Sequence, residues 1–211
     1  MTLQDLNAHI LLNSKDLNAE FKRLFHGRGG LYEDFKHLTI DSIDTVLSVA
    51  LYDEDASEEE LLELLKSFIK TSRHETIVLQ RRYIKDFPSE VIVGELSDEI
   101  FALEGGMKFK LNLLSNRNSG YFADMKIGRE FVRESAKDKN ILNLFSYTCA
   151  FSVAALFGGA KSVSNIDMSK ASLSIGRSNH HLNGLDTRRV SFLPYNILKS
   201  FSRIKKKGPY D

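Results

Sequence analysis

Residues 140–193 alternate between short apolar runs and helical stretches, and this pattern constrains the fold more than any other feature. Apolar runs at 141–145, 161–166 and 190–193 predict three strands. Helices are expected between them at 151–157 and 169–182. Strands that alternate with helices form parallel sheets, because a parallel connection needs a long crossover. An α/β domain with a parallel sheet is therefore predicted here.

The preceding residues carry a different pattern, with strands grouped around one helix. A helix is expected from about residue 57, where Ser57 and Glu60 have the spacing of a capping box. Another helix is predicted at 14–25, because Leu17, Phe21, Leu24 and Phe25 recur at helical spacing. The predicted strands lie near 38–43, 45–51, 76–83, 91–96, 99–102 and 108–114. We expect an N-terminal helix plus a small α+β domain over 1–115, and the α/β domain over 116–211.

Composition excludes several classes of protein. Cys149 is the single cysteine, which rules out an internal disulfide framework and multi-cysteine metal sites. No secretory signal is visible at the N-terminus, so a cytoplasmic protein with no membrane partner is expected. Residues 140–160 lack charge over 21 positions, the length of a membrane span, but their Asn, Ser, Tyr and Thr side chains favour a strand, a turn and a helix. Lys and Arg exceed Asp and Glu by only one, so a basic surface must be local.

The turn after the first α/β strand is the candidate binding site. In such sheets ligands bind at the carboxyl ends of the strands, and a helix N-terminus there favours an anionic group. The second strand ends in Asp167, 24 residues after Asn143, a position suited to accept hydrogen bonds from ribose hydroxyls. This arrangement predicts a cofactor that contains a nucleoside. The alternative is that Asp167 only caps a helix.

The residues of this turn bear on which cofactor fits. A dinucleotide site needs glycines for close approach to pyrophosphate, whereas the turn reads Phe145, Ser146, Tyr147, Thr148, Cys149, Ala150. A turn without glycine argues against a dinucleotide. It suits a cofactor with one nucleoside and a small charged tail, such as S-adenosyl-L-methionine.

Several ordered motifs resemble a known family. They are 143–148 with 150–153, Gly159-Ala160, 165–170, Asn179-His180 with Asn183-Gly184, 118–125 with Arg129, and 208–211. Together they resemble bacterial class I S-adenosylmethionine-dependent methyltransferases, in the group that methylates bases of large-subunit ribosomal RNA. The resemblance covers residues 26–211. It implies a Rossmann-like methyltransferase domain, of which only the first half is expected here, and RNA as the partner. It implies nothing about the oligomeric state.

The resemblance also implies roles for individual residues. Phe145, Ser146, Tyr147 and Thr148 would cradle the methionine part of the cofactor. Asp167 would hold the ribose, Met168 would pack on the adenine, and Asn143 and Ser169 belong to the same motifs. Asn196 stands where many relatives carry an acid that meets the adenine amino group, and its amide oxygen can accept that hydrogen bond. Asp124 and Arg129 would close the site, with Arg129 pairing with the cofactor carboxylate.

Family members continue into a strand and an Asp-Pro-Pro motif that faces the target base, and Asp211 stands at the start of that strand. No catalytic residue and no metal ligand is therefore expected in these residues. The activity of the chain stays open at this point. The alternatives are an inactive remnant that binds cofactor or RNA and, more weakly, a nicotinamide-dependent oxidoreductase.

Other motifs each allow two interpretations. Cys149 is a nucleophile or a packed side chain, and His180-His181 bind metal or only mark a polar helix end. Three basic segments either contact RNA or are ordinary solvated turns, strand ends and helix ends. They are 26–29 (His-Gly-Arg-Gly), 80–83 (Gln-Arg-Arg-Tyr) and the cations of 199–207.

Overall fold

The computed structural model describes residues 1–114 and 118–211, which divide into two compact units. The N-terminal unit comprises Met1–Gly105 and Leu111–Ser119, and the C-terminal unit comprises Gly106–Lys110 and Gly120–Asp211. The boundary predicted between residues 115 and 116 lies outside the described residues. Each unit is considered by itself below.

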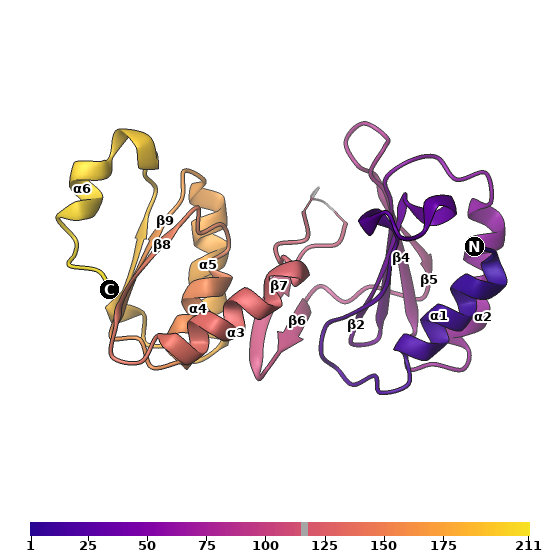
Figure 1. Ribbon diagram of the computed structural model, residues 1–211, viewed down its shortest axis with the longest axis horizontal. Helices are drawn as coiled ribbons and strands as arrows, with labels where there is room; N and C mark the ends of the chain where they lie inside the picture. The colour runs from indigo at the N-terminus through magenta and orange to yellow at the C-terminus, as the bar shows by residue number, and fades with distance from the viewer. Residues whose placement is uncertain (115–117) are drawn as a thin grey trace. The chain divides into compact units, whose positions relative to one another are not determined.

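The N-terminal unit is built on a five-stranded sheet in sequence order. Strands β3 and β4 run parallel, and the other neighbours run antiparallel. Helices α1 (Leu3–Asn13) and α2 (Glu58–Ile69) lie on the same side of this sheet (Figure 1). The strands are β1 (Lys22–His26), β2 (Leu38–Ile43), β3 (Val46–Leu51), β4 (Thr76–Arg81) and β5 (Ser89–Val93). The sequence prediction of β2 to β5 and α2 is thus confirmed in type; β2 has the predicted ends, and the ends of the others are shifted.

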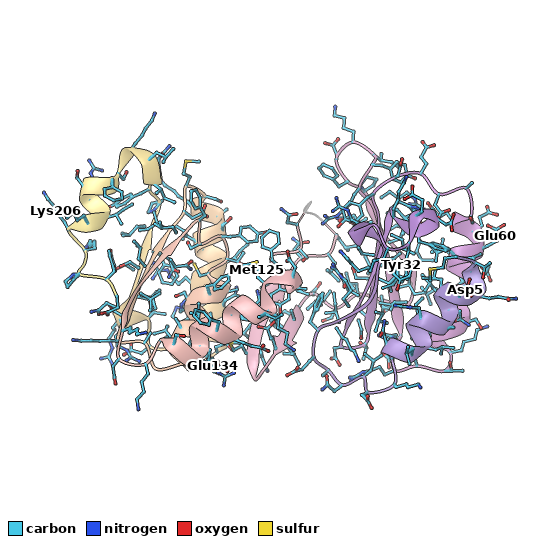
Figure 2. All side chains as sticks on the ribbon, viewed as in Figure 1. Asp5, Tyr32, Glu60, Met125, Glu134 and Lys206 are labelled. Atoms are coloured by element: carbon cyan, nitrogen blue, oxygen red, sulfur yellow. The ribbon has the colours of Figure 1, made fainter. Side chains whose placement is uncertain are left out.

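The core of this unit lies between the helices and one face of the sheet. Leu47, Val49 and Leu51 alternate along β3 and pack with Leu61 and Leu65 of α2. Beside them the ring of Tyr32, labelled in Figure 2, is tilted by 39° to that of Phe25, with 5.2 Å between the ring centres. The intervening residues of each strand face away from the helices, so the other face is more polar.

The helix predicted at 14–25 is wrong. Residues 22–26 form β1 and pair with β2, with a bulge between Arg23 and Phe25. The bulge allows Leu24 and Phe25, although adjacent, to be buried together, and adjacent apolar residues fit a helical pattern as well. The first helix instead begins after Thr2, whose side chain forms a capping box with Asp5.

The C-terminal unit contains a three-stranded parallel sheet in the order β10-β9-β8. Helices α3, α4 and α5 lie on one side of it and α6 on the other (Figure 1). Its elements are α3 (Lys126–Ser135), β8 (Asn140–Leu144), α4 (Ala150–Phe157), β9 (Ser162–Ile166), α5 (Lys170–Leu182), β10 (Val190–Leu193) and α6 (Phe201–Lys205). The predicted strand–helix alternation is confirmed, whereas α3 was not predicted. In Figure 2 the labelled Met125 and Glu134 mark the two ends of α3.

The strand register places matching residues in rows across this sheet. Ile141, Val163 and Val190 form one row, which packs on Ala155 and Leu156 of α4. No helix within the described ranges is long and apolar enough to cross a membrane. Residues 140–160 form a strand, a turn and a helix, as the side chains predicted.

Strands β6 (Ile100–Glu104) and β7 (Met107–Leu111) form a separate two-stranded sheet. The backbone of β7 is bound by two asparagines one turn apart, Asn179 on α5 and Asn183 at its C-cap. Asn179 Oδ1 accepts from the Lys110 amide at 2.9 Å, and Asn183 Oδ1 accepts from the Lys108 amide at 2.8 Å. Asn183 Nδ2 donates to the Lys108 carbonyl at 2.7 Å. These amides take the place of a neighbouring strand, which explains why helix α5 carries asparagine there.

Candidate functional site

The turn between β8 and α4 has an unusual backbone. Phe145, Tyr147 and Cys149 have positive φ angles of 52°, 47° and 62°. Bulky residues rarely adopt this conformation, and each instance costs on the order of 1–3 kcal/mol. Strain of this kind persists where surrounding contacts hold it and is concentrated at binding sites. The structure thus places a strained turn without glycine at the carboxyl end of the first parallel strand.

Asp167 fastens this turn to the end of β9. Its Oδ2 accepts a hydrogen bond from the Tyr147 amide at 2.8 Å, and its Oδ1 accepts from the Ser169 amide at 2.8 Å. The Ser146 amide donates to the Ile166 carbonyl at 3.0 Å. The structure therefore brings together the turn and the acid that sequence spacing predicted to be neighbours.

The segment before α3 contacts the same turn. Thr148 Oγ1 donates to the Gly120 carbonyl at 2.6 Å, and the ring of Phe122 lies 5.3 Å from that of Tyr147. The Thr148 carbonyl accepts from Asn179 Nδ2 at 3.0 Å. Gly120 has a φ of 97°, which favours glycine at this position. The turn is thus held from three sides, by 120–122, α5 and Asp167.

Polar groups at the start of α4 have hydrogen-bonding capacity that a ligand could use. Ser146 is only 7% exposed, and its Oγ has no hydrogen-bond partner among the described residues. Cys149 stands at the N-cap of α4 and makes no side-chain cap. The first amides of a helix then favour a negatively charged group, because they carry the positive end of its dipole. The arrangement fits a ligand with a small carboxylate.

Cys149 is packed rather than poised for reaction. It is fully buried, and burial raises the pKa of its thiol to about 12. A side chain at Gly176 of α5 would clash with its sulfur, so the helix and the turn are in close contact. The nucleophile interpretation is therefore set aside, because a neutral buried thiol is a poor nucleophile.

A chain of buried hydrogen bonds runs from β8 into the helices. Asn143 Nδ2 donates to Asn165 Oδ1 at 2.9 Å, and Asn165 Nδ2 donates to Ser152 Oγ at 3.0 Å. Ser152 Oγ lies 2.8 Å from His180 Nε2, and His180 Nδ1 lies 2.7 Å from the Gly176 carbonyl. A carbonyl only accepts, so Nδ1 carries the proton and Nε2 accepts from Ser152.

Burial lowers the pKa of His180, which agrees with this neutral form. No group of His, Cys, Asp and Glu that could hold a metal occurs in the described parts of the chain. His180 is therefore a structural member of the hydrogen-bond chain. The resemblance included Ser152, Asn165 and His180 without giving them roles. Polar residues within otherwise apolar elements were the available signal.

The remaining predicted residues surround the strand ends. Phe145 and Met168 are 75% and 68% exposed, so their apolar surfaces are available to a ligand. Ser169 caps α5, with its Oγ accepting from the Ser172 amide at 3.1 Å. Asn196 follows β10 and accepts from the Lys199 amide at 3.2 Å through Oδ1. Its amide oxygen thus already serves as a helix cap, which leaves one further lone pair.

Asp124 and Arg129 occupy different environments. Asp124 is exposed in a short 3-10 helix, Ala123–Met125. Arg129 is 1% exposed and donates to the Phe122 carbonyl at 2.8 Å and to Tyr121 Oη at 2.7 Å. Its guanidinium also lies 4.5 Å from the centre of the Tyr121 ring. The structure assigns Arg129 to bracing the 120–122 segment, and its pairing with a cofactor carboxylate stays a prediction.

The comparisons with known proteins agree with this geometry. A family model for S-adenosylmethionine-dependent methyltransferases matches residues 22–211, and the chain belongs to this family. It is 31% identical over 179 residues to ribosomal RNA large subunit methyltransferase I of Aeromonas salmonicida, covering 81% of this chain and 45% of that protein. It is 37% identical over 120 residues to the enzyme of that name from Aeromonas hydrophila, covering 56% of this chain and 30% of that protein. The chain thus spans less than half the length of these curated relatives.

Solved structures share the fold. A protein from Streptococcus mutans assigned as a SAM-dependent methyltransferase superposes with a TM-score of 0.84 at 22% identity, covering 98% of this chain and 56% of that one. The SAM-dependent methyltransferase of Agrobacterium tumefaciens superposes with a TM-score of 0.65 at 18% identity, covering 83% of this chain and 55% of that one. These likenesses confirm the predicted Rossmann-like methyltransferase fold.

Proposed function

We propose that the C-terminal unit holds S-adenosyl-L-methionine at the carboxyl ends of β8, β9 and β10. When bound, this cofactor supplies a methyl group on a positively charged sulfur. The observation that carries the proposal is the strained turn fastened by Asp167, because it joins an open helix N-terminus to an acid at the next strand end. A solved neighbour assigned as a methyltransferase was determined in complex with S-adenosylhomocysteine, the demethylated cofactor.

The residues present fit the parts of this cofactor. Each Asp167 oxygen accepts one amide hydrogen bond, and a carboxylate oxygen accepts about two, so one position on each oxygen stays available for ribose hydroxyls. Ser146 Oγ and the first amides of α4 would receive the methionine carboxylate. Met168 offers an exposed apolar side chain for the adenine face.

The other predicted residues complete the proposal. Phe145 and Tyr147 form the wall of the methionine site, and the buried Thr148 supports it from within the turn. Asn143 supports β8 from the buried hydrogen-bond chain. The residues assigned to the rim are Ser169, Asn196, Asp124 and Arg129.

We further propose that the substrate is RNA and that the methyl acceptor is a base of ribosomal RNA. The support is the name of the relatives, which are ribosomal RNA large subunit methyltransferases. No residue of this chain is assigned to activate the base. The nicotinamide alternative gains nothing from the family match or from the turn without glycine.

Isothermal titration with S-adenosylhomocysteine tests the cofactor site. Asp167→Asn is expected to weaken binding at least about tenfold, because the loss of a charged acceptor costs about 1.5–3 kcal/mol. Asp98→Asn is the matched control, since Asp98 is exposed in the N-terminal unit and should leave affinity unchanged. Circular dichroism of both variants checks folding. Binding of NAD with no binding of S-adenosylhomocysteine contradicts the proposal.

A further inference from the structure

We propose that the end of the N-terminal sheet around Tyr52, on the face away from its helices, is an RNA-docking surface. The inference rests on the proposed function, which makes RNA the substrate, and adds a binding surface outside the methyl-transfer site. Its centre is a cluster of Arg28, Tyr52 and Arg82, called the Tyr52 cluster below. The structure assembles it from two basic segments, 26–29 and 80–83, that lie far apart in the sequence.

The geometry of the Tyr52 cluster is that of cations against an aromatic ring. The Arg28 guanidinium lies 3.9 Å from the centre of the Tyr52 ring, and that of Arg82 lies 5.0 Å from it. Arg82 Nη1 donates to Tyr52 Oη at 3.1 Å, and Arg82 Nε donates to Gln80 Oε1 at 2.5 Å. The ring and the Arg82 guanidinium are therefore held in place before any ligand arrives.

Strand alternation places this cluster on the face without helices. Leu47, Val49 and Leu51 of β3 face the helices, so Ser48 and Ala50 face the other way. Tyr52 continues the second series beyond the end of β3. Its amide donates to the His37 carbonyl at 2.8 Å, and the Arg82 amide donates to the Leu51 carbonyl at 2.7 Å, so the strand pairing extends to these residues.

Further cations on β1 enlarge the surface. Arg23 pairs with Asp41 of β2 through two hydrogen bonds of 2.7 Å and 2.9 Å, and its Nη1 lies 3.0 Å from His26 Nδ1. Asp41 is also within electrostatic reach of His26 and Arg82. The cluster and this pair together hold three arginines and one aspartate, 3 − 1 = +2 with His26 neutral, and the exposed Asp53 and Glu54 follow Tyr52 along the chain. The two arginines of the cluster therefore place positive charge at the Tyr52 ring.

The acidic residues that follow Tyr52 differ in their contacts. Asp55 accepts from His37 Nε2 at 3.0 Å, whereas Asp53 acts only electrostatically on Lys36, which pairs with Glu33. Arg28 is exposed, and no carboxylate in the described residues pairs with it. Its charge is therefore available to an incoming anion.

The chemistry of this surface favours RNA. Guanidinium planes and a tyrosine ring stack on unpaired bases, and each stacked base contributes about 1–3 kcal/mol. The same arginines can hold phosphates, and sequence-tolerant binding to single-stranded loops combines these two contacts. Tyrosine and arginine are also common in protein interfaces, so the choice of RNA rests on the positive charge at the ring and on the proposed substrate. We therefore infer that the Tyr52 cluster receives an unpaired stretch of the RNA.

Fluorescence anisotropy of the full chain with a labelled stem-loop RNA tests the surface. Tyr52→Leu should weaken binding at least about fivefold, because it removes the ring that holds the two guanidinium groups in place for stacking on a base. Arg28→Gln should weaken it and lower the slope of log affinity against log salt by about one. Lys70→Gln removes the same charge from the exposed end of α2 and should bind like the wild type. Arg28→Lys should restore the salt slope without the full affinity.

The outcomes separate this surface from the cofactor site, provided that S-adenosylhomocysteine binding is measured on the same samples. Weakened RNA binding in Tyr52→Leu and Arg28→Gln, with cofactor affinity unchanged, supports the surface. Wild-type affinity in both variants overturns it, as does a wild-type chain that binds S-adenosylhomocysteine but not the RNA. A chain that binds RNA through these residues but not S-adenosylhomocysteine supports the surface and contradicts the cofactor proposal.

Discussion

The two units of this chain place their candidate sites on different parts of a sheet. In the N-terminal unit both helices cover one face, so the polar side chains gather on the opposite face. In the C-terminal unit the parallel strands end at one edge, so the turn after β8 and Asp167 after β9 lie together. The candidate site of the N-terminal unit therefore lies on a sheet face. The candidate site of the C-terminal unit lies in a strained turn at a sheet edge.

The largest effect should come from filling the close contact between α5 and the turn. Gly176→Val should lower the free energy of unfolding by about 3 kcal/mol or more, because the added atoms overlap Cys149. Gly29→Ala in the N-terminal unit is the control and should change it by less than about 0.5 kcal/mol, since its Cβ meets only ordinary contacts. Urea unfolding measures both. Equal effects in the two variants would contradict the contrast between the units.

Acid should destabilise the N-terminal unit through His74. Burial, followed by the nearby Arg73, lowers the pKa of His74 to about 4, and its ring lies 2.9 Å from the hydroxyls of Ser42 and Ser72. The unfolded chain therefore binds a proton at His74 more readily than the folded chain does. The contribution of His74 to the free energy of unfolding is fully present above pH 6.5, and about 3 kcal/mol is lost as the pH falls from 6.5 to 4.

Hydrogen exchange against pH measures this loss in each unit. His74→Gln should flatten the decline in the N-terminal unit. Burial also lowers the pKa of His180, so the stability of the C-terminal unit should likewise fall as the pH is lowered. An unchanged decline in His74→Gln would show that another group is responsible.

The smallest effect compares the caps of two helices. Ser169→Ala should cost about 1 kcal/mol, because Ser169 Oγ accepts from the Ser172 amide at the start of α5. Ser57→Ala should cost only a few tenths, since Ser57 stands at the N-cap of α2 without a side-chain cap bond. Thermal unfolding of the two variants ranks them. The reverse order would contradict the cap assignments.

Sequence reasoning was most successful where the hydrophobic pattern fitted one type of secondary structure only. Apolar strands and helices of the C-terminal unit were predicted because their period is unambiguous, and Asp167 was found from its spacing after β8. The helix at 14–25 failed because a bulge in β1 buries two adjacent apolar residues. The capping box expected at Ser57 and Glu60 also did not form, although α2 begins there.

Long-range contacts were beyond the reach of sequence patterns. Arg82 lies beside Tyr52 because β3 and β4 are neighbours in the sheet, whereas Arg28 reaches the same ring from the turn after β1. The binding of β7 by Asn179 and Asn183 likewise joins residues about seventy positions apart. The buried role of Arg129 could not be inferred, because a lone arginine in a sequence is most often exposed.

Hydrogen exchange with and without S-adenosylhomocysteine tests the central claim most directly. The account predicts slower exchange at the amides of 145–150 and 167–169, with the N-terminal unit unchanged. Protection absent from both segments in a chain that binds the ligand, or confined to the N-terminal unit, would contradict a cofactor site at the ends of β8 and β9.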